Sequence, residues 1–366
     1  MKINVAKDLL LEKLSLASRF TSSRLTSLTA LQGILIKGEK NKLHFYSTNL
    51  TSYIHTTLTV PLEENFRIII EPKKTTEFLQ FLDPGKIEVD IKENQVTISQ
   101  NKTKGSFPLI VSTEFPLPPE IKGKEQTLDV NFFKKNLPLI LFAASPDETR
   151  PSLTGVNFVV SEDDLIMVAT DGFRLSLIKT KKQIDIPSMI IPGDFLSELL
   201  HFVKDEKEVF FSYSPEEKII FFRVGDTRFY SRLIEGEFPP YERVIPADRK
   251  TKIILEKDEF LKNIKLISIF ARDFSNIVVC EFKKEGVFMR PKKENSENNN
   301  TFQEGQIKGE EQKVAFNYKF LLDLLNNIDT KLLQIEVLRS DAPVVFKIDG
   351  NPSFIHIVMP VRIQEE

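Results

Sequence analysis

Residues 5–20 read VAKDLLLEKLSLASRF, and similar patterns recur as VNFFKKNLPLILFAA at 130–144 and LEKDEFLKNIKLISIF at 255–270. Each stretch places apolar residues at helical spacing and intersperses them with lysine. A second helical pattern follows each of them, at 71–82, 192–203 and 317–328. Short alternating runs typical of strands lie around these helices. Since the repeat is about as long as a small domain, the pattern predicts three similar α+β domains rather than a stacked array of short repeats.

The composition is that of a globular protein of 366 residues, with 41% hydrophobic and 28% charged residues, which predicts two or three domains with apolar cores. The single cysteine, Cys280, excludes an intramolecular disulfide. Its apolar neighbours are typical of a buried strand, so we expect an unreactive thiol. The N-terminal residues carry charge where a secretory signal would be apolar, and no run approaches the roughly 20 apolar residues of a membrane span. These features predict a cytoplasmic location.

The net charge of −2 says little about nucleic acid binding, because the field at a surface depends on where the charges lie. Lysines recur on the predicted helices, whereas pairs of glutamates lie in predicted loops. An amphipathic helix ordinarily carries such lysines on its solvent face. Their recurrence on equivalent helices nevertheless suggests one continuous basic surface. Its predicted members are Lys7, Lys13, Lys74, Lys134, Lys135 and Lys265.

Strand patterns and prolines suggest where the domains meet. Two strand patterns run into Glu-Phe-Pro, at 114–116 and 237–239. Because proline cannot donate a hydrogen bond to a sheet ladder, we expect each of these segments to end a strand and begin a connector. The resulting domains span residues 1–123, 124–246 and 247–366. Within the third, the segment 292–312 is polar and rich in Asn and Glu, which predicts a mobile loop between two strands.

Catalytic motifs are absent from the sequence, which has no GxSxG, no HExxH, no phosphate-binding loop and no CxxC pair. A metal site needs three or four converging ligands, and the histidines are far apart in the sequence. We therefore interpret each as a surface or strand residue: His44, His55, His201 and His356. The sequence predicts no enzyme activity, no metal and no other cofactor.

Four motifs, in this order and spacing, resemble the bacterial DNA polymerase III beta subunit family, the sliding clamps. They are RPSLTGVNF at 150–158, ATDGFRLSL at 169–177, EGEFPPYERVIP at 235–246 and VMPVRI at 358–363. The resemblance covers the whole chain, including its length and its three repeats. It implies three tandem DNA clamp folds, each with two helices on antiparallel sheets, in a head-to-tail homodimer that closes into a ring around duplex DNA.

The resemblance implies a processivity factor that holds duplex DNA without reading its sequence. Lysines and arginines facing the DNA would bind phosphates through counterion release rather than through base contacts. Matching loop positions add Arg24, Arg150 and Phe274 to the predicted DNA contacts. Gly193 and Asp194 stand where clamps can carry basic residues, which argues against a DNA contact at the start of the 192–203 helix.

A hydrophobic pocket between the second and third domains is the second site that the resemblance implies. There the family captures short linear motifs of the replicative polymerase, the clamp loader and repair proteins. Apolar members would form adaptable walls, and Arg174 and Arg362 would meet a peptide carboxylate or carbonyl. Phe173 stands where the family often has His or another polar residue, which predicts a preference for aromatic or Leu-rich motifs. The predicted pocket comprises Leu153, Thr170, Gly172, Phe173, Arg174, Leu175, Pro239, Val244, Pro343, Met359, Pro360, Val361 and Arg362.

For the dimer contact, the resemblance implies that Phe107 and Leu109 meet Ile269 and Phe270 of the second copy. Three alternatives remain open. A non-encircling interaction scaffold of the same fold would keep the pocket and lose the basic surface. A trimeric, two-domain clamp of the eukaryotic type conflicts with the third repeat. An enzyme with a site assembled from the neighbourhoods of Asp163, Asp171 and His201 lacks any converging motif.

Overall fold

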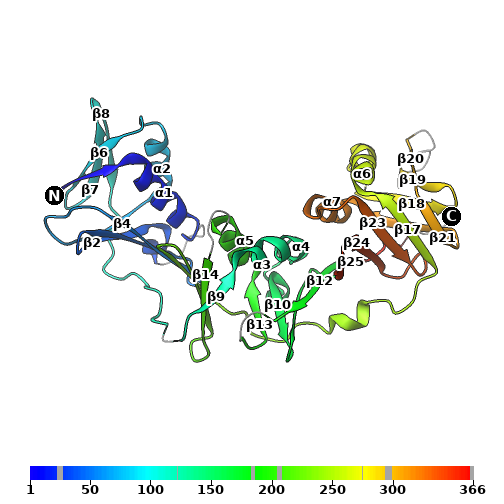
Figure 1. Ribbon diagram of the computed structural model, residues 1–366. Helices are drawn as coiled ribbons and strands as arrows, with labels where there is room; N and C mark the ends of the chain where they lie inside the picture. Colours follow the sequence, from blue (N-terminus) through cyan, green and yellow to red (C-terminus); the bar gives the residue numbers. More distant parts are fainter. Residues whose placement is uncertain are drawn as a thin grey trace. The chain divides into compact units, whose positions relative to one another are not determined.

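The computed structural model describes residues 1–22, 28–121, 123–182, 186–203, 208–273, 275–292 and 299–362. The predicted helices are present in all three repeats (Figure 1). The first helical position of each repeat holds α1 (Lys7–Ser18), α3 (Val130–Asn136) followed by α4 (Pro138–Leu141), and α6 (Lys257–Ala271). The second position holds α2 (Pro72–Gln80), α5 (Gly193–Phe202) and α7 (Tyr318–Asn327).

The 130–144 segment forms two short helices where one was predicted. Pro138 has no N–H to donate, so it begins a new helix after α3 instead of continuing that helix. Side-chain caps fix the start of three other helices, of which α6 begins where the Glu256 carboxylate accepts from the Glu259 N–H at 2.6 Å. The Glu71 carboxylate accepts from the Lys73 N–H at α2, and the Asn317 amide oxygen accepts from the Lys319 N–H at α7.

The strands follow the three repeats. The first repeat contains β1 (Lys2–Ala6), β2 (Ile34–Glu39), β3 (Lys42–Thr48), β4 (Ser52–Thr59), β5 (Phe66–Ile70), β6 (Lys86–Ile91), β7 (Gln95–Gln100) and β8 (Thr103–Pro108). The second contains β9 (Gln126–Asp129), β10 (Gly155–Val160), β11 (Asp164–Thr170), β12 (Arg174–Lys181), β13 (Met189–Pro192), β14 (Glu208–Ser214), β15 (Ile219–Val224) and β16 (Thr227–Arg232). The third contains β17 (Thr251–Glu256), β18 (Ile277–Lys283), β19 (Gly286–Pro291), β20 (Thr301–Glu304), β21 (Gln306–Gly309), β22 (Gln312–Asn317), β23 (Leu332–Val337), β24 (Val344–Ile348) and β25 (Asn351–Val358).

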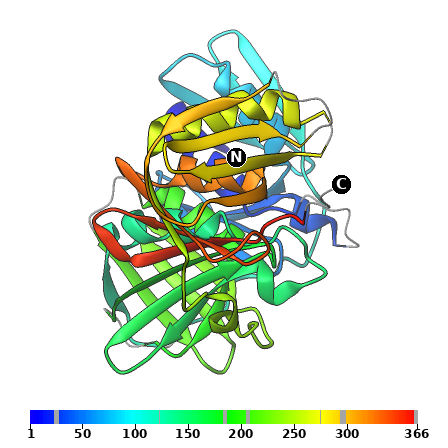
Figure 2. The same ribbon diagram turned by 90° about the vertical axis from the view of Figure 1, so that its right-hand side faces the viewer.

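Every repeat builds two antiparallel sheets with the same strand order. The sheet that follows the first helical position runs β5-β2-β3-β4, β13-β10-β11-β12 and β22-β18-β19-β20. The other sheet runs β1-β6-β7-β8, β9-β14-β15-β16 and β17-β23-β24-β25, with β21 added beside β17. Helix α6 packs on β18, β19 and β20, as Figure 2 shows for the third repeat.

Strand pairing also joins consecutive repeats. Strand β4 of the first repeat pairs with β16 of the second, so that their sheets form one continuous sheet. Strand β12 of the second repeat pairs with β25 of the third in the same way. The chain accordingly divides into two compact units, Met1–Val130 with Glu198–Leu233, and Asn131–Ser197 with Ile234–Glu366. The division falls within the second repeat because its two sheets belong to different continuous sheets.

The prediction of a loop across 292–312 was wrong for residues 301–309, which form β20 and β21. Gly305 lies between them, and a Cβ there would stand 2.4 Å from Leu255 Cδ2. Glycine therefore lets the chain pass from one sheet to the other. The polar Gln303 is fully buried, and its amide donates to the Glu256 carbonyl at 2.8 Å. Residues 293–298 lie outside the described part of the chain.

Two further expectations concern strand ends and the cysteine. Strands β8 and β16 end at Pro108 and Arg232, several residues before the Glu-Phe-Pro segments that were expected to end them. Cys280 is fully buried in β18, and burial raises the pKa of its thiol to about 12, which confirms the expected buried thiol. None of the helices in the described ranges is long and apolar enough to cross a membrane.

Candidate protein-binding site

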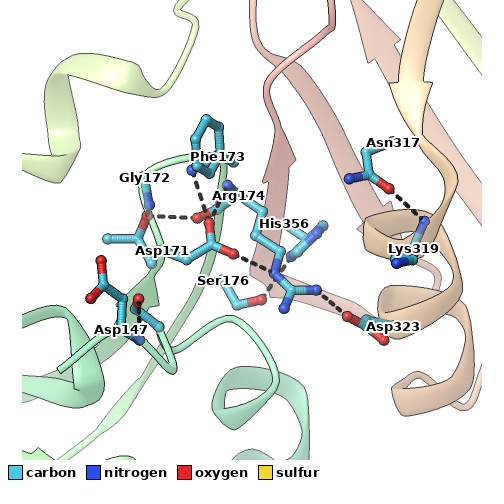
Figure 3. A network of polar contacts seen from close by, with 12 residues as sticks. Asp147, Asp171, Gly172, Phe173, Arg174, Ser176, Asn317, Lys319, Asp323 and His356 are labelled. Carbon is cyan, nitrogen blue, oxygen red and sulfur yellow. Dashed lines mark hydrogen bonds and ion pairs between the residues drawn. The ribbon is translucent and has the colours of Figure 1, made fainter. Parts of the chain in front are cut away.

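The turn between β11 and β12 holds the centre of the predicted pocket, and side-chain hydrogen bonds fix its shape (Figure 3). The Asp171 carboxylate accepts from the backbone N–H groups of Phe173 and Arg174, at 2.8 and 2.9 Å. The Thr170 hydroxyl donates to the Arg174 carbonyl at 2.6 Å and accepts from the Gly172 N–H at 3.1 Å. Gly172 has a φ of 91°, which glycine adopts without steric cost. The turn leaves Phe173 58% exposed.

Arg174 lies beneath this turn and links it to α7. Its Nε donates to Asp171 at 3.0 Å, and its Nη1 donates to Asp323 of α7 at 2.5 Å. The guanidinium carbon is 4.8 Å from the ring centroid of Phe320 and 5.7 Å from that of Phe142. Such flanking by carboxylates and rings suits a buried arginine. A peptide carboxylate would therefore have to displace an existing partner of Arg174.

A buried histidine stands next to Arg174 in the sheet. Ser176 and His356 face each other across β12 and β25, with 2.7 Å between the hydroxyl and Nδ1. Burial lowers the pKa of His356 to about 3, and the charge of Arg174 acts in the same direction. The ring is therefore neutral at physiological pH. Its Nε2 has no hydrogen-bond partner among the described residues.

The C-terminal segment approaches the same turn through backbone hydrogen bonds. The Met359 N–H donates to the Phe173 carbonyl at 2.8 Å, and the Val361 N–H donates to the Ala315 carbonyl at 2.8 Å. Pro360 and Val361 are half-buried, whereas Arg362 is exposed. Pro343 directly precedes β24, whose Val344 pairs with Val358. The structure thus brings the predicted turn residues and the predicted residues 359–362 together.

Leu175 belongs to an apolar cluster beside the site. It is buried in one cluster with Leu177, Ile357 and Tyr241. Tyr241 begins a 3₁₀ helix, Tyr241–Val244, and so brings the predicted Val244 to this sheet, where it is 38% exposed. The predicted Pro239 is exposed just before this helix. Leu153 is buried, in the 3₁₀ helix Pro151–Thr154.

Several residues of this site were missed by sequence reasoning. Phe142, Asp323, Phe320 and Tyr241 each contact a predicted member of the pocket. Tyr241 lies within the quoted motif at 235–246 but was not predicted as a pocket residue, and the other three lie outside the four motifs. Arg150 was predicted only as a DNA contact, yet its Nη1 lies 3.4 Å from the place where a Cβ of Gly172 would be. One signal was available, because an acidic residue recurs at the same position of each second helix.

The predicted DNA-contacting lysines fall into two groups. Lys7 and Lys13 of α1 are buried, and they pair with Asp8 at 2.7 Å and Asp226 at 2.9 Å. The exposed group comprises Lys74, Lys134, Lys135 and Lys265. Arg24 and Phe274 lie outside the described residues. A basic surface on the helices therefore depends on the exposed group.

The predicted dimer residues lie on a strand edge and on a helix. Phe107 is half-buried in β8, edge-on to Phe78 with 5.5 Å between ring centroids, and Leu109 follows that strand. Ile269 and Phe270 are 48% and 43% exposed on α6. A shallow hollow of about 420 Å³ lies on the same helix, lined by Asp258, Leu261, Lys262, Lys265, Leu266 and Ile269.

Two of the histidines that were interpreted as surface or strand residues lie on strands, as expected, and contact each other. His44 and His55 lie on neighbouring strands with 3.0 Å between Nδ1 and Nε2, and Tyr46 stacks on His55 with 4.3 Å between centroids. Burial lowers the pKa of both rings, that of His55 to about 4. The described residues contain no cluster of three or more His, Cys, Asp or Glu side chains suited to a metal ion.

Three family models match the chain in succession. The N-terminal, central and C-terminal domains of the DNA polymerase III beta subunit match residues 1–119, 127–240 and 242–362. The chain belongs to the DNA polymerase III beta subunit family. The predicted family and the three-domain clamp fold are thereby confirmed.

Curated relatives and solved structures extend this result. The Beta sliding clamp of Bacillus subtilis is 28% identical over 381 residues, covering 99% of this chain and 100% of that protein. The crystal structure of the DNA polymerase sliding clamp from Bacillus subtilis has a TM-score of 0.88 at 26% identity and covers 100% of both chains. A DnaN sliding clamp from Bartonella birtlesii, bound to griselimycin, shares the fold with a TM-score of 0.90 at 24% identity, covering 99% of this chain and 100% of that one.

Proposed function

We propose that this chain is a DNA sliding clamp, a non-catalytic processivity factor that closes as a head-to-tail homodimer around duplex DNA. It tethers the replicative polymerase, the clamp loader and repair proteins through short linear motifs, and it works in the cytoplasm. Its relatives bear the name Beta sliding clamp. The domains of the protein are 1–123, 124–246 and 247–366.

The strand pairing between repeats supports closure into a ring. Two junctions within the chain follow one rule. Strand β4, at the edge of one sheet of the first repeat, pairs with β16, at the edge of a sheet of the second repeat. Strand β12 of the second repeat pairs with β25 of the third in the same way. By the same rule β20 of the third repeat would pair with β8 of a first repeat. Among the described strands, β20 and β8 are each paired on one side only. Open strand edges favour pairing with another chain.

A second copy supplies both missing partners in a head-to-tail arrangement. Strand β20 of each copy pairs with β8 of the other, which closes the assembly because the contact occurs twice. Phe107 and Leu109 then approach Ile269 and Phe270 of the partner subunit. The exposure of Ile269 and Phe270 supports this contact, since large apolar side chains at a surface mark interaction sites when they are grouped.

The peptide site comprises the predicted pocket residues together with Arg150, Phe320 and Tyr241. Phe173 and Phe320 form a nearly parallel ring pair with 6.3 Å between centroids, and Phe173 is largely exposed. Exposed aromatic and apolar groups beside polar backbone atoms fit a peptide with aromatic or leucine side chains. Arg362, which is exposed, is better placed than Arg174 to receive a peptide carboxylate.

The exposed lysines on the helices, with Arg150, form the DNA-facing surface. Contacts of this type neutralise phosphates without reading bases, so the protein can slide. Affinity for DNA can remain low because retention depends on the closed ring. A scaffold that binds proteins but does not encircle DNA is the alternative, and it differs in having no topological hold on DNA.

Retention on DNA tests the proposal. The protein is loaded onto a nicked circular plasmid by a clamp loader, the complex is isolated, and half of it is linearised. A sliding clamp stays on circles and is lost from linear molecules. Equal retention on both forms would show direct binding instead. Absence from both, with a loader that acts on a known clamp, would favour the scaffold.

A further inference from the structure

The three second helices carry an acidic residue at the same position. Each helix begins within two residues of the end of a strand and buries its fourth residue, Thr75, Leu196 or Leu321, so the three share one register. The sixth residue of each is acidic: Glu77 in α2, Glu198 in α5 and Asp323 in α7. A helical register places these three side chains on equivalent faces.

At the first junction this acid binds an arginine of the preceding repeat. Arg19 is the residue that ends α1, in the first repeat, and its Nη1 donates to Glu198 of α5 at 2.9 Å. The guanidinium carbon also lies 5.8 Å from the ring centroid of Phe202, the tenth residue of α5. An ion pair and a cation–π contact thus connect the first repeat to the second.

At the second junction the same acid position is again paired with an arginine of the preceding repeat. Asp323 of α7 accepts from Arg174, as Figure 3 shows. Phe142 ends α4 at the position that Arg19 has in α1, and its ring lies against the Arg174 guanidinium. The arginine comes from a different element, but it again binds the acid and contacts aromatic rings.

The groups for a third such contact are present but belong to opposite ends of the chain. Glu77 of α2 is exposed, and Phe81, which directly follows α2 at the tenth position counted from Pro72, is 83% exposed. Arg272 ends α6 in the same αR conformation in which Arg19 ends α1, and its side chain is 65% exposed. Its guanidinium lies 3.8 Å from the carboxylate of the adjacent Asp273. The described strands join the first repeat to the second and the second to the third, but not the third to the first.

We propose that Arg272 binds Glu77 of the partner subunit and lies over Phe81 of the partner subunit. The inference rests on the proposed head-to-tail dimer, in which the third repeat of one copy meets the first repeat of the other. It assigns a partner to Phe81, whose side chain is more exposed than those of Phe173, Phe270 and Phe302. The contact occurs twice per dimer.

This contact selects the orientation of the dimer as well as stabilising it. A head-to-tail arrangement sets the cation of α6 against the anion of α2. A head-to-head arrangement would set like charges against each other, which disfavours it. An exposed ion pair alone contributes little, so the ring of Phe81 and the second copy of the contact are needed for a measurable effect.

Charge reversal of either residue tests the proposal by sedimentation. Both Glu77→Arg and Arg272→Glu place like charges at both contacts of the dimer, and we expect each to raise the dimer dissociation constant by roughly tenfold or more. An equimolar mixture of the two variants should form the mixed dimer in preference to either parent. In the mixed dimer one contact is native and the other is reversed, so opposite charges meet at both.

Recovery in the mixture distinguishes a direct contact from loss of folding, since a misfolded variant would not be rescued by a different variant. Glu63→Arg is the matched control, an exposed reversal in the segment between β4 and β5, and it should leave dissociation within about twofold of the parent. Phe81→Ala should weaken the dimer without changing the preference of the mixture.

The outcomes separate this inference from the function on which it rests. If the unaltered protein is monomeric at every concentration, the head-to-tail dimer itself is wrong. If the unaltered protein dimerises while both reversals dimerise equally well, the dimer stands and the Arg272–Glu77 contact is overturned. Weakening by both reversals without recovery in the mixture also overturns it.

Discussion

The turn between β3 and β4 in the first repeat and the turn between β11 and β12 in the second are built by the same hydrogen bonds. Thr48 donates to the Ser52 carbonyl and accepts from the Leu50 N–H, as Thr170 does with Arg174 and Gly172. The side chain of Asn49 accepts from two backbone N–H groups, as that of Asp171 does.

The surroundings of the two turns match as well. The Arg232 N–H donates to the Thr51 carbonyl at 2.8 Å, and the Met359 N–H donates to the Phe173 carbonyl at the same distance. What differs is the side chains that the turns present. Where the second turn has Phe173 and Arg174, the first has Thr51 and Ser52. The comparison teaches that the turn is part of the repeated scaffold, and that a few side chains convert one copy of it into the proposed peptide site.

Asp171→Ala should produce the largest difference between the two turns. It removes the side-chain acceptor of two backbone N–H groups and one of the two carboxylates that pair with buried Arg174, so we expect a loss of about 3–5 kcal/mol in stability and loss of peptide binding. The matched change Asn49→Ala removes only the side-chain acceptor of two backbone N–H groups and should cost about 1–2 kcal/mol. Thermal unfolding measures both. Equal losses would show that the Arg174 network adds nothing.

Acid should destabilise the protein through His356, which lies beside the second turn. Its pKa is about 3 when folded, and the ordinary value is 6.5. The unfolded chain therefore binds a proton that the folded chain excludes, and stability falls as pH drops below 6.5. We expect about 2–3 kcal/mol of loss by pH 4.5 from this group. His356→Gln, measured by unfolding from pH 7 to 4.5, should show a shallower decline.

A matched histidine tests this assignment in the first repeat. His55 has a folded pKa of about 4, so its contribution has the same sign and falls in the same pH window. His55→Gln should also flatten the decline, by less than His356→Gln because His55 is partly exposed to solvent. An unchanged pH profile in both variants would contradict the two low values.

Glycine and leucine occupy the same left-handed position in the two turns. Gly172 has a φ of 91° and Leu50 a φ of 74°. Gly172→Ala should destabilise the protein by about 1 kcal/mol, whereas Leu50→Gly should be neutral or slightly stabilising because it relieves strain. Thermal unfolding of the two variants measures the contrast. A stabilising Gly172→Ala would show that the second turn tolerates a side chain in this conformation.

Phe173→His should have the smallest effect on stability and a selective effect on binding. The change removes apolar area beside Phe320, so peptides with aromatic or leucine residues should lose affinity by a few fold relative to polar ones. Fluorescence anisotropy with a panel of labelled peptides measures the ranking. An unchanged ranking would remove Phe173 from the determinants of preference.

The sequence was sufficient to predict the helices and the three-fold repeat, because amphipathic spacing is a local property. It did not predict the break at Pro138 within 130–144. It also did not predict β20 and β21 in the polar segment, because the buried Gln303 is stabilised by a hydrogen bond to the distant Glu256 carbonyl and the segment lacks the apolar pattern of a strand. The sequence also predicted Lys7 and Lys13 on an exposed basic surface, but both are buried. The burial of Lys13 was not predictable because its ion-pair partner, Asp226, is far away in the chain.

The candidate site was predictable as far as the family resemblance reached. Its turn residues and residues 359–362 do come together. The partner of Arg174 was not predictable, because Asp323 lies 149 residues away and only tertiary packing brings the two together. Only the comparison between repeats connects Asp323 with Glu198 and Glu77.

Hydrogen exchange of the two open strand edges tests head-to-tail closure most directly. Amide exchange is measured above and below the concentration at which the dimer dissociates. Closure predicts that β8 and β20 are both protected in the dimer, while β16 and β25, already paired within the chain, do not change. Exchange in β8 and β20 that is the same at both concentrations, in a protein that dimerises, would contradict the account.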